Sequence, residues 1–499
     1  MRDASKGARN RPVGDNRGEV RGVRLSEIIP GARFIACDDL VVRRCQDDPD
    51  ECRTGDVFVA RITERGDGHE AVSRAIARGA SGVIAERIVS TEGVPLCLVP
   101  DADRALARLC HALAGDPSRE MRVIAVVGTS GKTTTTWLTA AALAEAGHRV
   151  GVLSDLGCLG PDDAEAAPDD VSSPAALARW LARLAAGGCS HAVVEVSSRM
   201  LAAHATAGMV CDTVVVTNLA GAHLDQHGSH RAYRKIMTRI MDTLPEEGCL
   251  VTGMNPRQRG RLLAAAPESA TCLTAGLSPD CDVWARPVEG SLFGRTFLMG
   301  CGGQMVPVTT DTPTVPFVRD TLLAAAVAAR YGVTLERACR GIEATKGVPG
   351  RLERIDRGQE TPVFVDGPSS MHSVSATLSS LRRLTSGRLV VLADERLAER
   401  LGGRRFGRRL EKWCDEWLFV PESVVSDDPS AADIVAYARV DRLLASLGPH
   451  DCAVVLGDVP RGPAPSGPRA GRASLEILVN GWLQLAHPAV APFDRRRAA

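Results

Sequence analysis

Residues 123–136 read VIAVVGTSGKTTTT, an apolar run that passes through two glycines into a lysine followed by four threonines. The apolar part predicts a buried strand, and the alanine- and leucine-rich residues that follow predict a helix continuing to Glu145. Between a strand and a helix, a glycine-rich turn binds phosphate well, because backbone N–H groups and the positive end of the helix converge on its oxygens. We therefore predict a nucleotide-binding loop at residues 128–133.

Two side chains of this loop suit phosphate chemistry. Lys132 can reach the β- and γ-phosphates of a nucleotide, and the hydroxyl of Thr133 can ligate Mg²⁺. Only five of the 60 basic side chains in the chain are lysines, so a lysine at this position is informative. The alternative interpretation is a structural turn with an incidental lysine, since the longer P-loop pattern would place a further glycine at Val126.

The sequence around the loop predicts an α/β fold of three domains. Short apolar runs alternate with helical stretches, which is typical of a parallel sheet. The predicted strands are residues 56–60, 82–85, 96–99, 123–127, 150–153, 192–196, 213–217, 362–366, 389–393, 417–420 and 453–456. Residues 280–312 are rich in Gly, Val and Thr and predict a small antiparallel insertion.

We expect the central P-loop parallel-sheet domain to be flanked by an N-terminal α/β substrate domain and a C-terminal Rossmann-like domain. The segment at 347–350, Gly-Val-Pro-Gly, predicts the second linker. The predicted divisions are a disordered tail at 1–22, an N-terminal UDP-sugar-binding-like domain at 23–118, a central ATP-binding domain at 119–348 and a C-terminal ligase domain at 349–499.

Composition excludes several classes of function. The 60 basic and 60 acidic side chains balance, which argues against a general nucleic-acid binder and against an adhesive membrane surface. No apolar run approaches the roughly 18 residues that a membrane helix needs. The 15 cysteines are scattered without a CxxC pair, which favours reduced thiols in a cytoplasmic protein without a zinc site. We expect a monomer.

Three segments together resemble the Mur ligase family. Residues 128–136 resemble its GTNGKTTTT signature, Glu195-Val196-Ser197-Ser198 resembles its EVSSH segment, and residues 217–228 resemble TNL…DHLDYHG. Val348 to Glu353 resembles the family's entry into its third domain, and the order and spacing hold from about residue 45 to 355. The similarity is greatest to the member that adds the third residue of the peptidoglycan stem peptide.

The resemblance implies an ATP-dependent amide ligase that forms an acyl phosphate from a UDP-muramoyl-peptide-like substrate and joins it to an amino acid. It implies catalytic roles for Lys132, Glu195 and His223, with Thr133, Glu195 and His223 as Mg²⁺ ligands. The implied ATP-binding residues are Gly128, Thr129, Ser130, Gly131, Lys132, Thr133, Thr134, Arg351 and Asp366. Ser172, Ser173, Ser197 and Ser198 would contact the muramoyl peptide, although each serine alone is typical of a loop or a helix cap. His223 alone would be read as a turn histidine.

Several positions depart from the family. The lysine that is carbamylated in the family falls on Met237, its substrate-binding arginine on Ala205, and its adenine-binding asparagine on Thr321. Lys235 is two positions from Met237, so on a helix it points in a roughly opposite direction. In the third domain only the ribose-binding aspartate survives, as Asp366.

Two main hypotheses follow. The first is an active ligase with an altered amine substrate. The second is a catalytically impaired paralogue that binds nucleotide and acts as a regulatory or scaffold protein; an unrelated P-loop ATPase or kinase is a weaker third. We expect the surroundings of Met237 to discriminate, because a substitute carboxylate near Glu195 would favour the ligase and an apolar plug would favour the paralogue.

Overall fold

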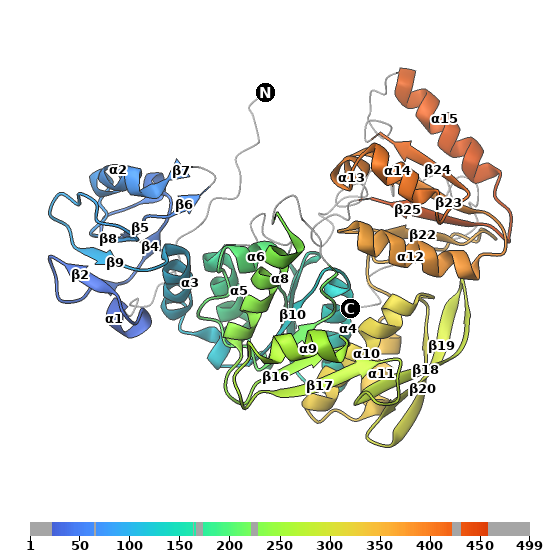
Figure 1. Ribbon diagram of the computed structural model, residues 1–499, viewed down its shortest axis with the longest axis horizontal. Coiled ribbons are helices and arrows are strands. Elements are labelled where there is room, and N and C mark those ends of the chain that lie inside the picture. The colour runs from blue at the N-terminus through green and yellow to red at the C-terminus, as the bar shows by residue number, and fades with distance from the viewer. Residues whose placement is uncertain are drawn as a thin grey trace.

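The computed structural model describes residues 22–63, 66–162, 164–165, 173–220, 228–421 and 431–457. Three sheets follow one another along the long axis of the molecule, each flanked by helices (Figure 1). This confirms the predicted α/β class. The tail predicted at 1–22 lies outside the described residues except for Gly22.

The first sheet has five strands in the order β2-β9-β8-β5-β4. β4, β5, β8 and β9 run parallel, and β2 is antiparallel to β9. The strands are β2 (Arg33–Ile35), β4 (Cys45–Gln46), β5 (Val57–Val59), β8 (Gly82–Ala85) and β9 (Leu96–Leu98). Around them lie β1 (Val23–Arg24), β3 (Val41–Val42), β6 (Ile62–Thr63), β7 (Gly66–Asp67), α1 (Leu25–Ile28), α2 (Val72–Ala77) and α3 (Ala102–Leu113).

The central sheet has eleven strands in the order β13-β12-β11-β14-β10-β15-β16-β17-β18-β19-β20. From β11 to β18 every neighbouring pair is parallel, which places the carboxyl ends of these strands along one edge. The parallel strands before the extension are β10 (Arg122–Val127), β11 (Val150–Ser154), β14 (His191–Glu195), β15 (Thr213–Val216), β16 (Cys249–Thr252) and β17 (Thr271–Gly276). The short strands β12 (Gly157–Leu159) and β13 (Ala164–Glu165) add antiparallel at one margin.

The segment predicted as an antiparallel insertion at 280–312 is antiparallel but is not a separate unit. It forms β18 (Val283–Ser291), β19 (Gly294–Cys301) and β20 (Gln304–Thr310), which pair antiparallel with one another. β18 also pairs with β17 in parallel, through Ala275 and Gly276. The extension therefore continues the central sheet.

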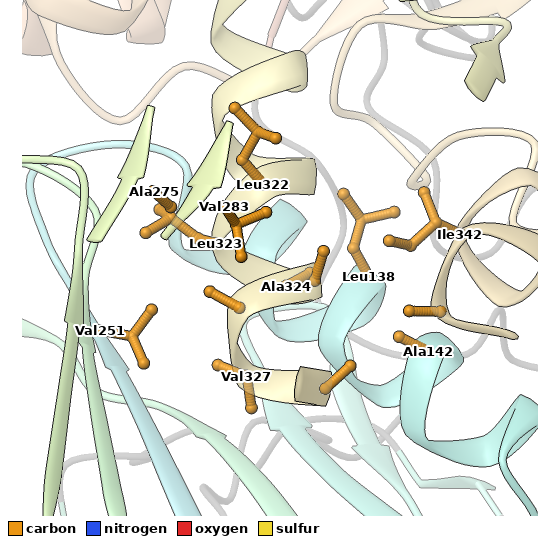
Figure 2. Close-up of a cluster of buried hydrophobic side chains, with 14 of the residues drawn as sticks. Leu138, Ala142, Val251, Ala275, Val283, Leu322, Leu323, Ala324, Val327 and Ile342 are labelled. Atoms are coloured by element: carbon orange, nitrogen blue, oxygen red, sulfur yellow. The ribbon is translucent and has the colours of Figure 1, made fainter. Parts of the chain in front are cut away.

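Helix α10 (Val315–Arg330) holds one core of the central domain together. Its residues from Leu322 to Ala328 are all buried, as expected for a helix that is apolar on every side. Figure 2 shows the α10 side chains between the sheet residues Val251, Ala275 and Val283 and the helix residues Leu138, Ala142 and Ile342. The other helices of this domain are α4 (Lys132–Glu145), α5 (Pro174–Ala186), α6 (Ser198–Ala202), α8 (His230–Thr238), α9 (Pro256–Leu263) and α11 (Leu335–Ala344).

The third sheet has five strands in the order β21-β22-β25-β23-β24, parallel except for β21. The strands are β21 (Glu353–Ile355), β22 (Val363–Asp366), β23 (Leu389–Asp394), β24 (Glu416–Val420) and β25 (Cys452–Leu456). Its helices are α12 (Met371–Leu384), α13 (Glu395–Arg400), α14 (Arg404–Leu410) and α15 (Ala431–Ala445). All 15 cysteines are free thiols. No helix in the described ranges has the length and apolar content that crossing a bilayer requires.

Candidate active site

The glycine-rich loop joins the end of β10 to the start of α4. Gly128 and Gly131 have φ angles of 152° and 80°, which residues with a side chain rarely adopt. A Cβ atom on Gly128 would lie 1.9 Å from the hydroxyl of Thr217, and one on Gly131 would lie 2.4 Å from Asp320 Oδ1. Both positions therefore require glycine, for the backbone angle and for the space.

Residues that follow β15 anchor the loop. Thr217 Oγ1 donates a hydrogen bond to the carbonyl of Ser130 at 2.6 Å, and Asn218 Nδ2 donates to the same carbonyl at 3.0 Å. The first backbone hydrogen bond of α4 runs from Thr135 N to Gly131 O, so the N–H groups just before it have no partner inside the helix. The loop is held by its carbonyls while the start of α4 stays free to bind an anion.

Lys132 and Glu195 meet beside this loop. Glu195 is the last residue of β14, which runs parallel to β10, so strand register brings it to the same edge as the loop. Lys132 Nζ lies 3.7 Å from Glu195 Oε1. Glu195 is only 5% exposed, and within the described residues its Oε1 atom accepts no hydrogen bond. A buried carboxylate oxygen without a hydrogen bond is costly, and a bound cation would remove that cost.

Asp155 is a second carboxylate at this edge, and the sequence reasoning missed it. It directly follows β11, and its N–H donates a hydrogen bond to Glu195 Oε2 at 3.2 Å. Burial and the negative charge of Asp155 raise the pKa of Glu195, against the opposing charges of Lys132 and Arg351. Its place at the carboxyl end of a parallel strand was the signal that could have identified it.

Arg351 links the central domain to the third. Its Nη2 donates to the hydroxyl of Thr133 at 3.1 Å, and its Nη1 donates to the carbonyl of Gly367 at 2.8 Å. Asp366, at the end of β22, accepts hydrogen bonds from Leu352 N at 3.2 Å and Thr377 Oγ1 at 3.0 Å. Burial raises the pKa of Asp366, and the charge of Arg351 opposes that rise. The structure thus brings Arg351, Thr133 and Asp366 together, but the oxygens of Asp366 already have partners.

The predicted substrate serines that are described lie at helix starts. Ser173 caps α5 by accepting a hydrogen bond from Ala176 N at 3.4 Å, and Ser197 caps α6 by accepting one from Met200 N at 3.1 Å. Ser198 is the first residue of α6. Capping is the structural role that each serine would have on its own, so substrate contact stays a prediction. Ser172 and His223 lie outside the described residues.

Met237 has apolar surroundings, as one of the two hypotheses requires. It is 1% exposed and belongs to the same buried cluster as Tyr233 and Met200. Tyr233, one helical turn earlier, forms a hydrogen bond with the hydroxyl of Thr129 over 3.0 Å. Lys235 is exposed, as predicted from helical geometry. The family's carboxylate is therefore not supplied at position 237, and Asp155 is the nearby carboxylate that the other hypothesis requires.

Asp320 is a further carboxylate that sequence reasoning missed. It lies on α10 against Gly131, and burial raises its pKa well above the ordinary value. An acidic residue in an otherwise apolar helix was the available signal. The neighbouring Thr321, at the family's adenine-binding position, is fully buried and donates a hydrogen bond to the carbonyl of Phe317 at 2.9 Å. Thr321 therefore faces its own helix and not a ligand.

The donor set at this edge suits Mg²⁺ better than a transition metal. In the described part of the chain, no three histidine, cysteine or acidic side chains cluster as a metal cage. Mg²⁺ does not need such a cage, since it is usually held by one or two carboxylates together with substrate phosphates and water. Glu195, Asp155 and the hydroxyl of Thr133 could provide oxygen ligands of that kind.

Comparison with known proteins identifies the family. Residues 126–328 match the Mur ligase middle domain. A UDP-N-acetylmuramyl-tripeptide synthetase of Roseiflexus sp. (strain RS-1) is 33% identical over 363 residues, which cover 68% of this chain and 70% of that protein. The chain belongs to the Mur ligase family.

Solved structures share the fold of this Mur ligase. A UDP-N-acetylmuramoyl-L-alanyl-D-glutamate–2,6-diaminopimelate ligase superposes with a TM-score of 0.67 at 19% identity, covering 93% of this chain and 99% of that one. The MurF ligase of Thermotoga maritima, solved in complex with ADP, superposes with a TM-score of 0.59 at 18% identity, covering 89% of this chain and 98% of that one. The three-sheet architecture is thus the Mur ligase fold.

Proposed function

We propose that this Mur ligase is an ATP-dependent carboxylate–amine ligase that extends the peptide of a UDP-muramoyl-peptide substrate by one amino acid. One observation carries the proposal. Lys132 lies beside the buried Glu195 Oε1, which accepts no hydrogen bond among the described residues, next to a loop whose Gly128 and Gly131 leave no space for a side chain. A cationic group and an unsatisfied carboxylate beside free helix N–H groups are the elements that phosphoryl transfer from a nucleotide needs.

The reaction has two steps. A substrate carboxylate oxygen attacks the γ-phosphorus of ATP, forming an acyl phosphate and releasing ADP. The amine of the incoming amino acid then attacks the acyl carbon, loses a proton and displaces inorganic phosphate as the amide bond forms. In the first step Lys132 and the N–H groups of the loop balance the charge that spreads over the transferring phosphoryl oxygens.

The metal ligands that we propose are Thr133, Glu195 and His223, joined by Asp155. When bound, Mg²⁺ would screen the charge of the phosphate oxygens during transfer. Asp155 follows β11 and Glu195 is the last residue of the neighbouring strand β14, and together they could supply the carboxylate that Met237 cannot. Arg351 contacts Thr133 from the third-domain side and would neutralise charge at the same phosphates.

Substrate placement follows the three sheets. We propose that the unit at 23–118 binds the UDP-sugar end, that the unit at 119–348 binds ATP, and that the unit at 349–499 presents the amine. Ser172, Ser173, Ser197 and Ser198 would contact the muramoyl peptide beside the ATP site. Asp366 would meet the ribose of ATP if the hydroxyls of the sugar replaced its present partners, Thr377 Oγ1 and Leu352 N.

The direct test is amine-dependent turnover. Purified full-length protein is incubated with ATP, Mg²⁺, a UDP-muramoyl dipeptide and each member of an amino-acid panel. We expect ADP release only when a suitable amino acid is present, together with a product heavier by one residue. ADP binding without turnover across the panel would refute the ligase proposal and support the nucleotide-binding paralogue. Failure to bind ATP at all would refute both.

A further inference from the structure

A positively charged cavity lies between helix α3 and the central domain. Figure 1 shows α3 between the first sheet and the central helices. The cavity has a volume of about 50 Å³, and its lining includes Arg104 and Arg108 from α3, Arg239 from the turn after α8, and His204. One water needs about 10–15 Å³ on this scale, so the cavity is large enough for a few waters or one tetrahedral oxyanion.

The arginines of the cavity are available to a ligand to different extents. Arg239 Nη1 donates to the carbonyls of Leu201 and Ala202 at 3.1 and 3.2 Å, which fixes it at the end of α6. In the described part of the chain, by contrast, no carboxylate lies within ion-pairing distance of the Arg104 or Arg108 guanidinium. Arg104 and Arg108, which have no ion pair among the described residues, thus line the same cavity as Arg239, whose guanidinium is held in place.

The backbone forms this cavity at some conformational cost. His204 has a φ angle of 52°, and its Nε2 lies 3.5 Å from Asp101 Oδ2. Gly208 has a φ angle of 95°, and a Cβ atom there would lie 3.0 Å from the Cα of Arg108. The left-handed conformation of His204 is costly for a residue with a side chain, by about 1–2 kcal/mol. Gly208 lets the chain approach α3 closely enough to close the wall beside Arg108.

The charges favour an anion but are not wholly positive. Asp242, from the same turn as Arg239, also lines the cavity. Burial and the nearby charge of Arg239 lower the pKa of His204, which disfavours a positive charge on its ring. The lining thus contains three arginines and one carboxylate, and Asp101 beside His204 is a second acidic neighbour. The planar guanidinium of arginine can donate two parallel hydrogen bonds to two phosphate oxygens. A neighbouring carboxylate weakens this binding but does not prevent it.

We propose that this cavity is a phosphate-binding site. Arg104, Arg108 and Arg239 bind the phosphate group, and the charge of Asp242 lowers its affinity. The cavity shares no residue with the ATP site, and its test requires neither ATP nor turnover. The phosphate group could belong to free inorganic phosphate or to the diphosphate of a uridine nucleotide, and the measurements below distinguish these sources.

The test measures binding of inorganic phosphate, UDP and uridine to the full chain by calorimetry at low ionic strength. The Arg104→Gln/Arg108→Gln variant should bind phosphate at least about tenfold more weakly, because two charge-assisted contacts are lost. Asp242→Asn should bind it more tightly, because a repelling charge is removed. Arg286→Gln, an exposed arginine on β18, serves as the matched control and should equal the wild type.

Phosphate bound at the glycine loop would be equal in all four proteins, so the differences report on the cavity alone. If UDP binds more tightly than uridine and the double variant removes that difference, the site takes a nucleotide diphosphate. If only inorganic phosphate responds, the site takes the free ion. Equal phosphate binding in all four proteins would overturn the proposal. Should the double variant fail to fold, the gain expected for Asp242→Asn still decides it.

Discussion

The carboxyl edges of the central and third sheets differ in whether their buried polar atoms have hydrogen-bond partners. At the central edge, Glu195 Oε1 and Asn218 Oδ1 are buried without hydrogen-bond partners among the described residues. At the third edge, Asp366 accepts bonds from Leu352 N and Thr377, and Ser370 forms a capping box with Ser373 at the start of α12. A buried polar atom that makes no hydrogen bond lowers the stability of the folded protein. The presence of such atoms at the central edge and not at the third marks the central edge as the one with polar atoms available to bind a ligand.

The largest effect should come from Lys132→Ala, which removes the cation of the central edge. We expect ATP-dependent turnover to fall by roughly 10²–10³-fold, the range seen when one stabilising group of a transition state is removed. Steady-state ADP release measures it. Lys235→Ala is the matched control, since Lys235 is exposed on α8, and it should retain wild-type turnover. Equal losses in both variants would mean that Lys132 has no special role.

The second-largest effect should come from Gly131→Ala, because the added methyl group disturbs the glycine-rich loop beside the buried atoms that lack hydrogen bonds. The left-handed backbone and the Cβ contact at 2.4 Å with Asp320 should together cost about 2 kcal/mol of stability, with weaker ADP binding. Gly332→Ala separates the two causes, since Gly332 has a φ angle of 75° but open space around it. Thermal melting and ADP titration of both variants measure the difference. If Gly131→Ala and Gly332→Ala have the same melting temperature and the same ADP affinity, a collision between the new Cβ atom and Asp320 is ruled out.

Asp155→Asn tests whether the central edge holds its metal through a carboxylate pair. We expect Mn²⁺, used as a spectroscopic substitute for Mg²⁺, to bind about tenfold more weakly in the presence of ADP. Loss of the neighbouring charge should also lower the pKa of Glu195. Asp311→Asn, at an exposed position, is the control, and electron paramagnetic resonance counts the free Mn²⁺. Unchanged affinity would remove Asp155 from the ligand set.

The smallest predicted effect concerns His111. It tests whether buried polar atoms without hydrogen bonds always indicate a ligand site. Among the described residues, neither of the buried ring nitrogens of His111 has a hydrogen-bond partner, as at the central edge, but burial alone lowers its pKa to about 4. A depressed histidine pKa gives stability that is lost as pH falls from the unfolded value toward the folded one. Between pH 7 and pH 6 the wild type should therefore lose about 0.7 kcal/mol more than His111→Leu.

Chemical denaturation at the two pH values measures this difference. ADP binding should be the same in His111→Leu and in the wild type. Weaker ADP binding in the variant would mean that buried polar atoms without hydrogen bonds, even far from the loop, also belong to the nucleotide site.

Residues close in sequence to the glycine loop were predictable, and those brought near it by folding were not. The loop, Lys132 and the strand that ends in Glu195 follow from local patterns and from the family resemblance. Asp155 follows β11 and Asp320 lies on α10, and their local signals, a strand end and an acidic residue in a mostly apolar helix, do not reveal that they lie beside Glu195 and Gly131. The same limit explains the segment at 280–312, because its pairing with β17 depends on a strand partner that local composition cannot reveal.

Arg351 has a consequence for the order of events. Its guanidinium contacts the Thr133 hydroxyl, the oxygen that the metal of an arriving ATP would use, and also the carbonyl of Gly367 in the third domain. Phosphate oxygens would compete with that hydroxyl for the guanidinium, so nucleotide arrival should move Nη2 of Arg351 from Thr133 onto the phosphates while its Nη1 stays on Gly367. The same guanidinium would then join the third domain to the nucleotide and no longer to the loop, so bound ATP would help to hold the two domains together. We therefore expect ATP to bind before the amine.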